Sequence, residues 1–228
     1  MESIGNTIAA LIRAELLTQD GVVKVAAAPR FTTLYSEGSS ADSVLFLESG
    51  LIKLCKPGDD GKELIIEVIT PGELFGELAL GSEPTRLADA QVLLESTVYI
   101  IPKGLFMSFC EGHPSMWRGL AQLLLRRSRG LQEKVELLCT RDVEYRILHC
   151  VAESARSFGE RSESGEYAIS LSQAELASLI SATRETTSTT LNQLERRGLI
   201  RLGRRKIILA SLDGATIAAP EASEAAFA

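Results

Sequence analysis

Hydrophobic positions along this chain change their spacing twice. In the first twenty residues they recur every three or four positions, which predicts a short amphipathic helix on Ile4, Ile8, Leu11, Ile12 and Leu16. From about residue 26 to residue 101, short apolar runs alternate with turns at Gly38, Ser49-Gly50, Asp60-Gly61 and Pro71-Gly72. The runs predict strands at residues 43–47, 51–56, 63–69, 91–94 and 97–101. Many short strands at regular spacing indicate a small barrel or sandwich.

A long helix is predicted after residue 102, where the three- and four-residue spacing returns. Its apolar stripe is interrupted at Arg127 and Ser128 and consists of Met116, Leu120, Leu123, Leu124, Leu131, Val135 and Leu138. So narrow a stripe favours a parallel coiled coil, in which these seven residues join two copies of the chain as a homodimer. The alternative is an ordinary helix that packs on its own core.

The chain is expected to divide near Thr140, between the long helix and a second helix over about residues 143–158. The polar stretch at residues 159–166 is typical of a loop. From Pro220 onward, small residues and Glu dominate without an apolar period, so we expect a mobile tail.

A pair of short helices is predicted next. Ser172 and Glu175 have the spacing of a capping box, so the first helix begins at Gln173. After a break at residues 180–182, a second helix begins at Thr183. Its apolar face carries Thr187, Leu191 and Leu194, and its outward face near the amino end carries Arg184, Glu185, Ser188 and Thr189.

Gly198 is expected to end this second helix in the left-handed conformation, and residues 199–209 then form a small hairpin. Two helices joined by a tight turn and followed by a hairpin describe a winged helix-turn-helix. In such a motif the second helix enters the major groove of DNA.

Composition places these elements in a globular protein. The chain has 228 residues, of which 45% are hydrophobic and 24% charged, and no apolar run approaches the roughly 18 residues that span a bilayer. With no secretory signal at its start, we expect a cytoplasmic protein without a membrane partner. The four cysteines are expected to be buried free thiols. Two histidines and no metal-ligand spacing argue against an enzyme and against a resident metal.

Charge is distributed unevenly. The formal net charge is −6, which by itself argues against a nucleic-acid partner. Between Arg184 and Lys206, however, seven basic side chains face two acidic ones, a local net charge of +5. This basic cluster coincides with the predicted helix-turn-helix and therefore favours DNA binding.

The segment LSQAELASLISATRETTSTTLNQLERRGLI, residues 171–200, closely resembles the helix-turn-helix of the Crp/Fnr superfamily of bacterial transcription regulators. The resemblance implies that Arg184 and Glu185 read bases, whereas Thr189 stands where relatives carry a further arginine. It places the other DNA-binding residues at Ser172, Thr183, Ser188, Arg196, Arg197, Arg204 and Arg205. It also implies a homodimer on a near-palindromic duplex, with RNA polymerase as a further partner.

Residues 75–80 (FGELAL) and 84–88 (PTRLA) resemble the phosphate-binding cassette of cyclic-nucleotide-binding domains. The resemblance implies that Glu77 accepts from a ribose 2′-hydroxyl and that Arg86 pairs with the cyclic phosphate. Backbone N–H groups around Gly76, Leu78 and Ala88 would complete the anion cradle. Leu87 departs from the family's small or polar residue at that position. Leu131 and Gln132 occupy the base-contacting positions of the long helix.

Together these features predict an α+β fold with a sensor domain at residues 1–110, whose barrel covers about 24–102. A dimerisation helix at 111–139, a winged helix-turn-helix at 140–213 and a tail at 214–228 follow. The predicted function is a DNA-binding transcription regulator controlled by a small effector. The effector is a cyclic nucleotide or another molecule. Alternatively the cassette is a relic in which Glu77 pairs with Arg86, and the protein is an effector-independent activator. A third alternative is a cyclic-nucleotide-binding regulatory subunit that acts on a protein partner.

Overall fold

A computed structural model describes residues 9–58, 63–82, 85–163 and 165–211. Its contacts divide the chain into two compact units, residues 1–132 and 133–228. The helices break near Thr140 as expected, but the division falls earlier, inside the long helix, because its last turns belong to the second unit. The proposed tail, Ile4, Ile8 and the turn at Gly61 lie outside the described residues. Among the described residues, no helix is both long and apolar enough to cross a membrane.

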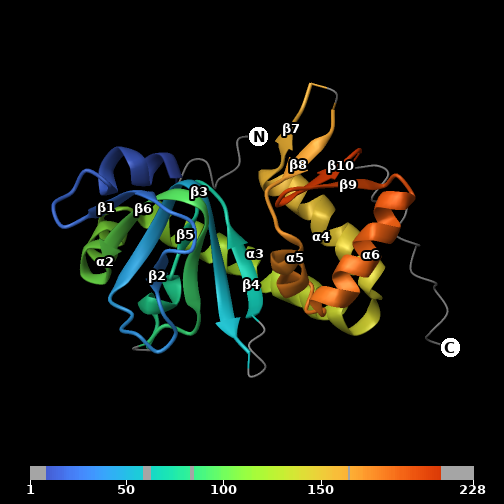
Figure 1. Ribbon diagram of the computed structural model, residues 1–228. Helices are drawn as coiled ribbons and strands as arrows, with labels where there is room; N and C mark the ends of the chain where they lie inside the picture. Colours follow the sequence, from blue (N-terminus) through green and yellow to red (C-terminus); the bar gives the residue numbers. More distant parts are fainter. Residues whose placement is uncertain (1–8, 59–62, 83–84, 164, 212–228) are drawn as a thin grey trace. The chain divides into compact units, whose positions relative to one another are not determined.

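The first unit is an antiparallel β structure with helices at both ends of its sequence (Figure 1). The strands pair in the order β1-β6-β3-β4, with β2 on β6 and β5 on β3. Its elements are η1 (Ile12–Leu16), β1 (Val23–Ala28), β2 (Thr33–Tyr35), β3 (Ser43–Pro57), β4 (Glu63–Ile69), β5 (Leu74–Phe75), η2 (Glu77–Leu80), β6 (Asp89–Pro102), α2 (Lys103–Gly112) and all but the last turns of α3 (Pro114–Thr140).

Strands β3 and β6 are each one long strand where the sequence predicts two, and Gly50 explains the difference. The predicted turn at Gly50 is an irregularity within β3, where the register against β6 shifts between Leu47 and Leu51. Gly50 has φ +91°, and a Cβ there would lie 2.2 Å from the Ser96 Oγ atom. Only glycine permits this close approach, so the residue marks a bulge rather than the end of a strand.

The core of the first unit has two parts. One lies within the sheet, and the other joins the sheet to η1, α2 and the first half of α3. Met116, Leu120 and Leu123 belong to this second part, with 1%, 8% and 7% of their surface exposed. Their predicted place in a dimer contact is therefore wrong, because η1, α2 and the sheet of the same chain already cover them.

The second unit contains the predicted helix pair and hairpin. Its elements are α4 (Val143–Phe158), β7 (Glu160–Arg161), β8 (Tyr167–Ile169), α5 (Gln173–Leu179), α6 (Arg184–Arg196), β9 (Ile200–Gly203) and β10 (Lys206–Leu209). The four strands form one antiparallel sheet in the order β7-β8-β10-β9 (Figure 1). The predicted loop at residues 159–166 is partly strand, because Ser162 and Glu166 bond across the turn and bring β7 against β8.

The cysteines are all free, but not all are buried. Cys55 and Cys110 are buried, Cys150 is half-buried and Cys139 is exposed, which corrects the expectation for Cys139. Burial raises the pKa of Cys55 to about 12 and that of Cys110 to about 11. These two thiols therefore stay protonated at neutral pH and act as small apolar side chains.

Candidate effector and DNA-binding sites

The cassette is organised around Gly76, which is buried and has φ +71°. This left-handed residue ends β5 and turns the chain into η2, so that Glu77 follows at once. A Cβ at Gly76 would lie 2.5 Å from the Arg86 Nη1 atom. Glycine is thus required both by the backbone conformation and by the approach of Arg86.

Arg86 is 5% exposed, although it is charged. Its Nη1 donates to the Gly76 carbonyl at 2.9 Å, and its Nη2 donates to the Ser43 carbonyl at 2.6 Å. The guanidinium carbon lies 4.2 Å from the centre of the Tyr35 ring. The Nε atom has no hydrogen-bond partner among the residues that the structure describes.

Burial lowers the pKa of Arg86, and among the described residues no carboxylate forms an ion pair with it. Burial also raises the pKa of Tyr35 to about 12, so its hydroxyl stays protonated and the ring beside Arg86 is uncharged. A buried cation without a counterion is costly, and an anionic ligand would remove that cost. This geometry suits the phosphate-binding role predicted for Arg86.

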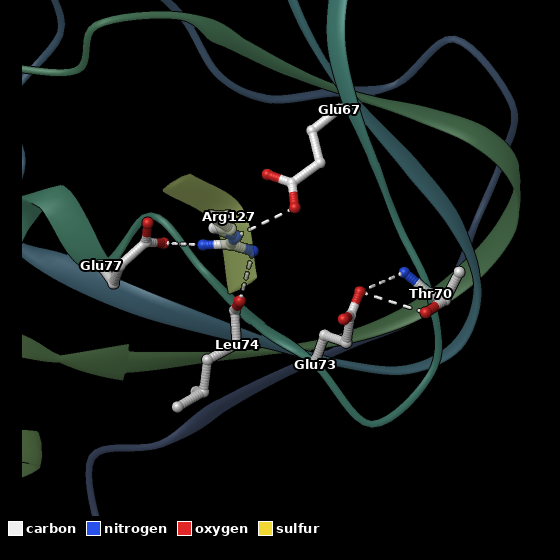
Figure 2. Close-up of polar contacts among 6 residues, drawn as sticks. All are labelled: Glu67, Thr70, Glu73, Leu74, Glu77 and Arg127. Carbon is white, nitrogen blue, oxygen red and sulfur yellow. Dashed lines mark hydrogen bonds and ion pairs between the residues drawn. The ribbon is translucent and has the colours of Figure 1, made fainter. Parts of the chain in front are cut away.

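Glu77 is also buried, but its partner is Arg127 of α3 rather than Arg86 (Figure 2). The Arg127 Nη1 atom forms an ion pair with Glu77, and Nε donates to Glu67 Oε1 at 3.0 Å. Its Nη2 atom donates to the Leu74 carbonyl at 2.9 Å. The alternative of a Glu77–Arg86 ion pair is therefore wrong.

The Glu67–Arg127–Glu77 cluster has two negative charges and one positive. Burial opposes the charge of Arg127, but the Glu77 and Glu67 carboxylates outweigh it and raise the pKa of Arg127. For Glu67 burial dominates and raises its pKa, even though the Arg127 charge acts in the opposite direction. Arg127 is thus firmly charged and holds both carboxylates, and burial makes Glu67 easier to protonate than a carboxyl group in water.

Sequence reasoning missed Glu67 and Arg127. An arginine that interrupts an otherwise apolar helical stripe was the available signal, because such a residue needs a buried partner or an exit to solvent. The remaining predicted effector residues lie differently. Leu78 and Leu87 are 53% and 46% exposed, and Ala88 is half-buried. On α3, Leu131 and Gln132 are exposed.

An apolar face remains uncovered along α3. Leu124, Leu131 and Val135 are 42%, 48% and 60% exposed, and Leu138 is half-buried. Trp117, at 39%, extends the face toward the start of the helix. Trp117, Leu124, Leu131 and Leu138 recur every seven residues, the spacing of a coiled-coil seam.

In the second unit, the predicted capping box is present. Ser172 accepts from the Glu175 backbone N–H, and Glu175 accepts from that of Ser172 at 2.8 Å. The turn after α5 is fixed by Arg146, whose Nη1 donates to the Ile180 carbonyl at 2.9 Å. Ser181 completes the turn at φ +53°, a conformation that costs a serine more than a glycine.

Helix α6 presents the predicted polar face. Thr183 caps it by accepting from the Thr186 N–H at 3.1 Å, which makes Arg184 the first helical residue. Its inner face is buried, as predicted for Thr187, Leu191 and Leu194. Its outer face near the amino end carries Arg184, Glu185 and Thr189, which are exposed, and Ser188, which is half-buried. Exposed polar groups at the start of such a helix can reach base edges.

The basic cluster divides into paired and unpaired cations. Three of its members have carboxylate partners: Arg197 with Glu144 at 2.6 Å, Arg201 with Glu166 at 2.6 Å, and Lys206 with Glu160 at 3.8 Å. Among the described residues, Arg184, Arg196 and Arg204 form no ion pair. Arg205 lies in the β9–β10 turn at φ +59° and is exposed. Gly198 ends α6 at φ +74°, as predicted.

Comparisons with known proteins identify both units. Residues 27–113 match the family model of the cyclic nucleotide-binding domain, and residues 145–214 match that of the Crp-like helix-turn-helix domain. The chain is similar to a "CRP-like cAMP-activated global transcriptional regulator" of Mycobacterium tuberculosis, with 28% identity over 79% of this chain and 81% of the relative. It is similar to the "Anaerobic regulatory protein" of Bacillus subtilis, with 27% identity over 81% of this chain and 79% of the relative.

Solved structures of the same family have a similar fold. A CRP-family transcriptional regulator from Thermus thermophilus has a TM-score of 0.74 and 27% identity, and covers 90% of this chain and 100% of its own. The c-di-GMP responsive global regulator CLP of Xanthomonas campestris has a TM-score of 0.77 at 20% identity, covering 88% of this chain and 98% of its own, which shows the shared fold.

The fold is thus a cyclic nucleotide-binding β domain, a long helix and a Crp-like helix-turn-helix with a small sheet. The chain belongs to the Crp/Fnr family of transcription regulators and, like the rest of that family, is not an enzyme. The family membership that the sequence motifs indicated and the predicted α+β fold class are confirmed.

Proposed function

We propose that a small anionic effector, a cyclic nucleotide or a molecule like it, binds the cassette and changes the affinity of the second unit for DNA. The observation that carries this proposal is Arg86, a buried cation with an unbonded Nε and no carboxylate partner among the described residues. The relative of Mycobacterium tuberculosis, which is named for cAMP activation, supports the same chemistry.

The cluster around Arg127 supplies a route from effector to helix. A nucleotide whose ribose 2′-hydroxyl bonds to Glu77 must share that carboxylate with Arg127. Because Arg127 belongs to α3, a change in its pairing acts directly on the helix that continues into the second unit. An effector shifts the protein between two states only as far as its affinity for them differs, and competition for Glu77 provides such a difference.

The partner of this regulator is a two-fold symmetric duplex. Two copies joined through the exposed face of α3 present two α6 helices, which favours a near-palindromic site. We expect RNA polymerase as a further partner, as the resemblance to this family implies, and we expect the protein to act in the cytoplasm.

The test measures DNA affinity with and without a panel of cyclic mono- and dinucleotides. Differential scanning fluorimetry first selects the nucleotide that stabilises wild type. Arg86→Ala should then cost about 2–5 kcal/mol of nucleotide binding, because it removes a buried charge-assisted pair. Arg13→Ala, which removes an exposed arginine of the same unit, is the matched control and should bind as wild type does. Absence of any nucleotide binding to wild type, or equal affinity in Arg86→Ala, contradicts the proposal.

One observation favours the second candidate, an effector-independent activator. Glu77 is already paired with Arg127 of its own chain, so this carboxylate needs no ligand to balance its charge. In this case wild type binds its DNA site with one affinity whatever nucleotide is added. The third alternative, a subunit that acts only on a protein partner, leaves the helix-turn-helix without a use.

A further inference from the structure

The hairpin formed by β7, its turn and β8, residues 160–169, is acidic and lies beside the basic wing. It carries Glu160, Glu163 and Glu166 against one arginine, Arg161. Strand β8 pairs directly with β10 in the order β7-β8-β10-β9 (Figure 1). We call residues 160–169 the acidic hairpin and the β9–β10 hairpin, residues 200–209, the wing.

Two carboxylates of the acidic hairpin contact cations of the wing. Glu166 Oε2 lies 2.6 Å from Arg201 Nη2, and Glu160 Oε2 lies 3.8 Å from Lys206 Nζ. Both cations are exposed, with 62% and 50% of their side-chain surface accessible. The wing residue Arg204, by contrast, forms no ion pair among the described residues. The carboxylates of the acidic hairpin thus neutralise Arg201 and Lys206 of the wing but not Arg204.

A carboxylate that holds a wing cation competes with DNA phosphate for the same charge. Phosphate contacts give affinity that does not depend on sequence, and their contribution grows with the number of phosphates that the protein's cations neutralise. Because these ion pairs are exposed, each can change the balance only a few-fold. Base readout by Arg184 on α6 is not attenuated in this way, because no carboxylate pairs with it in the described part of the chain.

We propose that Glu166, assisted by Glu160, is a specificity-determining residue that weakens sequence-independent DNA binding by the wing. The acidic hairpin takes the place of phosphate on Arg201 and Lys206 when no DNA is bound. Base contacts from α6 then supply a larger share of the total affinity, so the protein discriminates its site more sharply. The proposal rests on the proposed DNA-binding function and adds that cations of the wing contact the DNA backbone.

The test compares Glu166→Gln with Glu163→Gln in the full-length protein. Both substitutions remove one negative charge from the acidic hairpin, but Glu163 takes part in none of the ion pairs among the described residues. Each variant is titrated against a random-sequence duplex and against a duplex that wild type has selected from a randomised library, at three salt concentrations.

Glu166→Gln should strengthen binding to the random-sequence duplex by about two- to fivefold at low salt, more than Glu163→Gln does. The slope of log affinity against log salt should steepen by up to about one unit. The ratio of selected-site to random-sequence affinity should fall correspondingly. In the Glu166→Gln background, Arg201→Gln should weaken binding more than it does in wild type, since its charge is then available to DNA.

Equal effects of Glu166→Gln and Glu163→Gln would show that only net charge matters and would overturn the proposal. If the wing does not contact the DNA backbone at all, the result is different. In that case Arg204→Ala, which removes an unpaired wing cation, also leaves DNA affinity and its salt dependence unchanged. Matching thermal unfolding curves of both variants exclude a difference in folding as the cause.

Discussion

The Glu67–Arg127–Glu77 cluster is an unusual use of charge inside a β domain. One buried carboxylate, Glu77, and one half-buried carboxylate, Glu67, share the guanidinium of Arg127, so three charged groups lie together at the edge of the core. Such an arrangement is weak support for stability, because the cost of desolvation offsets much of the Coulombic attraction. Its value lies in position, since the Arg127 side chain joins α3 to β4 through Glu67, to β5 through the Leu74 carbonyl and to η2 through Glu77.

A pH dependence follows from Glu67. Burial raises its pKa above the usual 4.5, so the folded protein binds this proton more readily than the unfolded chain does. Stability linked to a raised pKa is fully present below the unfolded value and is lost as pH rises through the folded value. Glu67→Gln keeps a hydrogen-bond acceptor for Arg127 but cannot titrate. Wild type should therefore gain stability relative to Glu67→Gln as pH falls from neutral toward the usual value of 4.5.

Urea unfolding of both proteins across this pH range measures the difference. Glu95→Gln removes an exposed carboxylate of the same unit that has no ion pair among the described residues, and it serves as the control. A difference between wild type and Glu67→Gln that does not vary with pH contradicts the assignment of a raised pKa to Glu67.

At the residue scale, motif spacing placed Glu77 and Arg86 in the cassette, because both lie on one short stretch of chain. It could not place Glu67 or Arg127. Their meeting joins a strand to a helix sixty residues further along, and no local pattern encodes which carboxylate such an arginine reaches. The same limit produced the wrong Glu77–Arg86 pairing.

At the element scale, α3 serves two purposes along its length. Its first half packs on the barrel through Met116, Leu120 and Leu123, and its uncovered face carries Leu124 and Leu131. Leaving several large apolar side chains exposed on one helix costs free energy that association with a second copy recovers. This is the physical basis for proposing the dimer on the second set of residues alone.

Replacing both Leu124 and Leu131 with Asp should convert dimers into monomers, because it places charges opposite each other across the seam. Sedimentation velocity measures the change. DNA binding to the selected site should be lost with it, since a single α6 helix reads only one half-site. Arg129→Asp, an exposed position away from this face, should leave the dimer intact. An unchanged dimer in the double variant would locate the contact elsewhere.

The elements themselves were largely predictable where the signal is local. The capping box at Ser172, the cap at Thr183 and the left-handed Gly198 all stand where the sequence predicts them. Strand lengths were not predictable. A bulge and a turn both favour glycine, and only the contact of Gly50 with Ser96 distinguishes them. The polar composition of residues 159–166 likewise concealed β7.

At the scale of the whole molecule, the net charge of −6 is compatible with DNA binding because the positive charge is concentrated in one region. Acidic residues elsewhere limit non-specific attraction to nucleic acid, while the cluster around α6 and the wing supplies the local field. Part of that cluster is held by carboxylates, so the cations available to DNA at first contact are fewer than the sequence suggests.

Removing a base-reading arginine, such as Arg184, should therefore affect DNA binding differently from removing a phosphate-contacting arginine, such as Arg204. In a two-fold dimer, the selected DNA should be a near-palindrome with half-site centres about 10 base pairs apart. Arg184→Ala should flatten the sequence preference, because an arginine on a guanine edge gives about 1–3 kcal/mol of discrimination. Arg204→Ala should weaken binding to all sequences alike and reduce the salt slope by about one unit, because a phosphate contact carries no sequence information.

Selection from a randomised duplex library, followed by salt titrations, measures both effects in the same protein preparation. Arg197→Ala is an informative third variant, because Arg197 is held by Glu144 and should change the salt slope less than Arg204 does. If Arg184→Ala selects the same motif as wild type, α6 does not place its first residue against a base edge. Glu185, Ser188 and Thr189 on the same exposed face would then have to supply the readout, and their substitution would locate it.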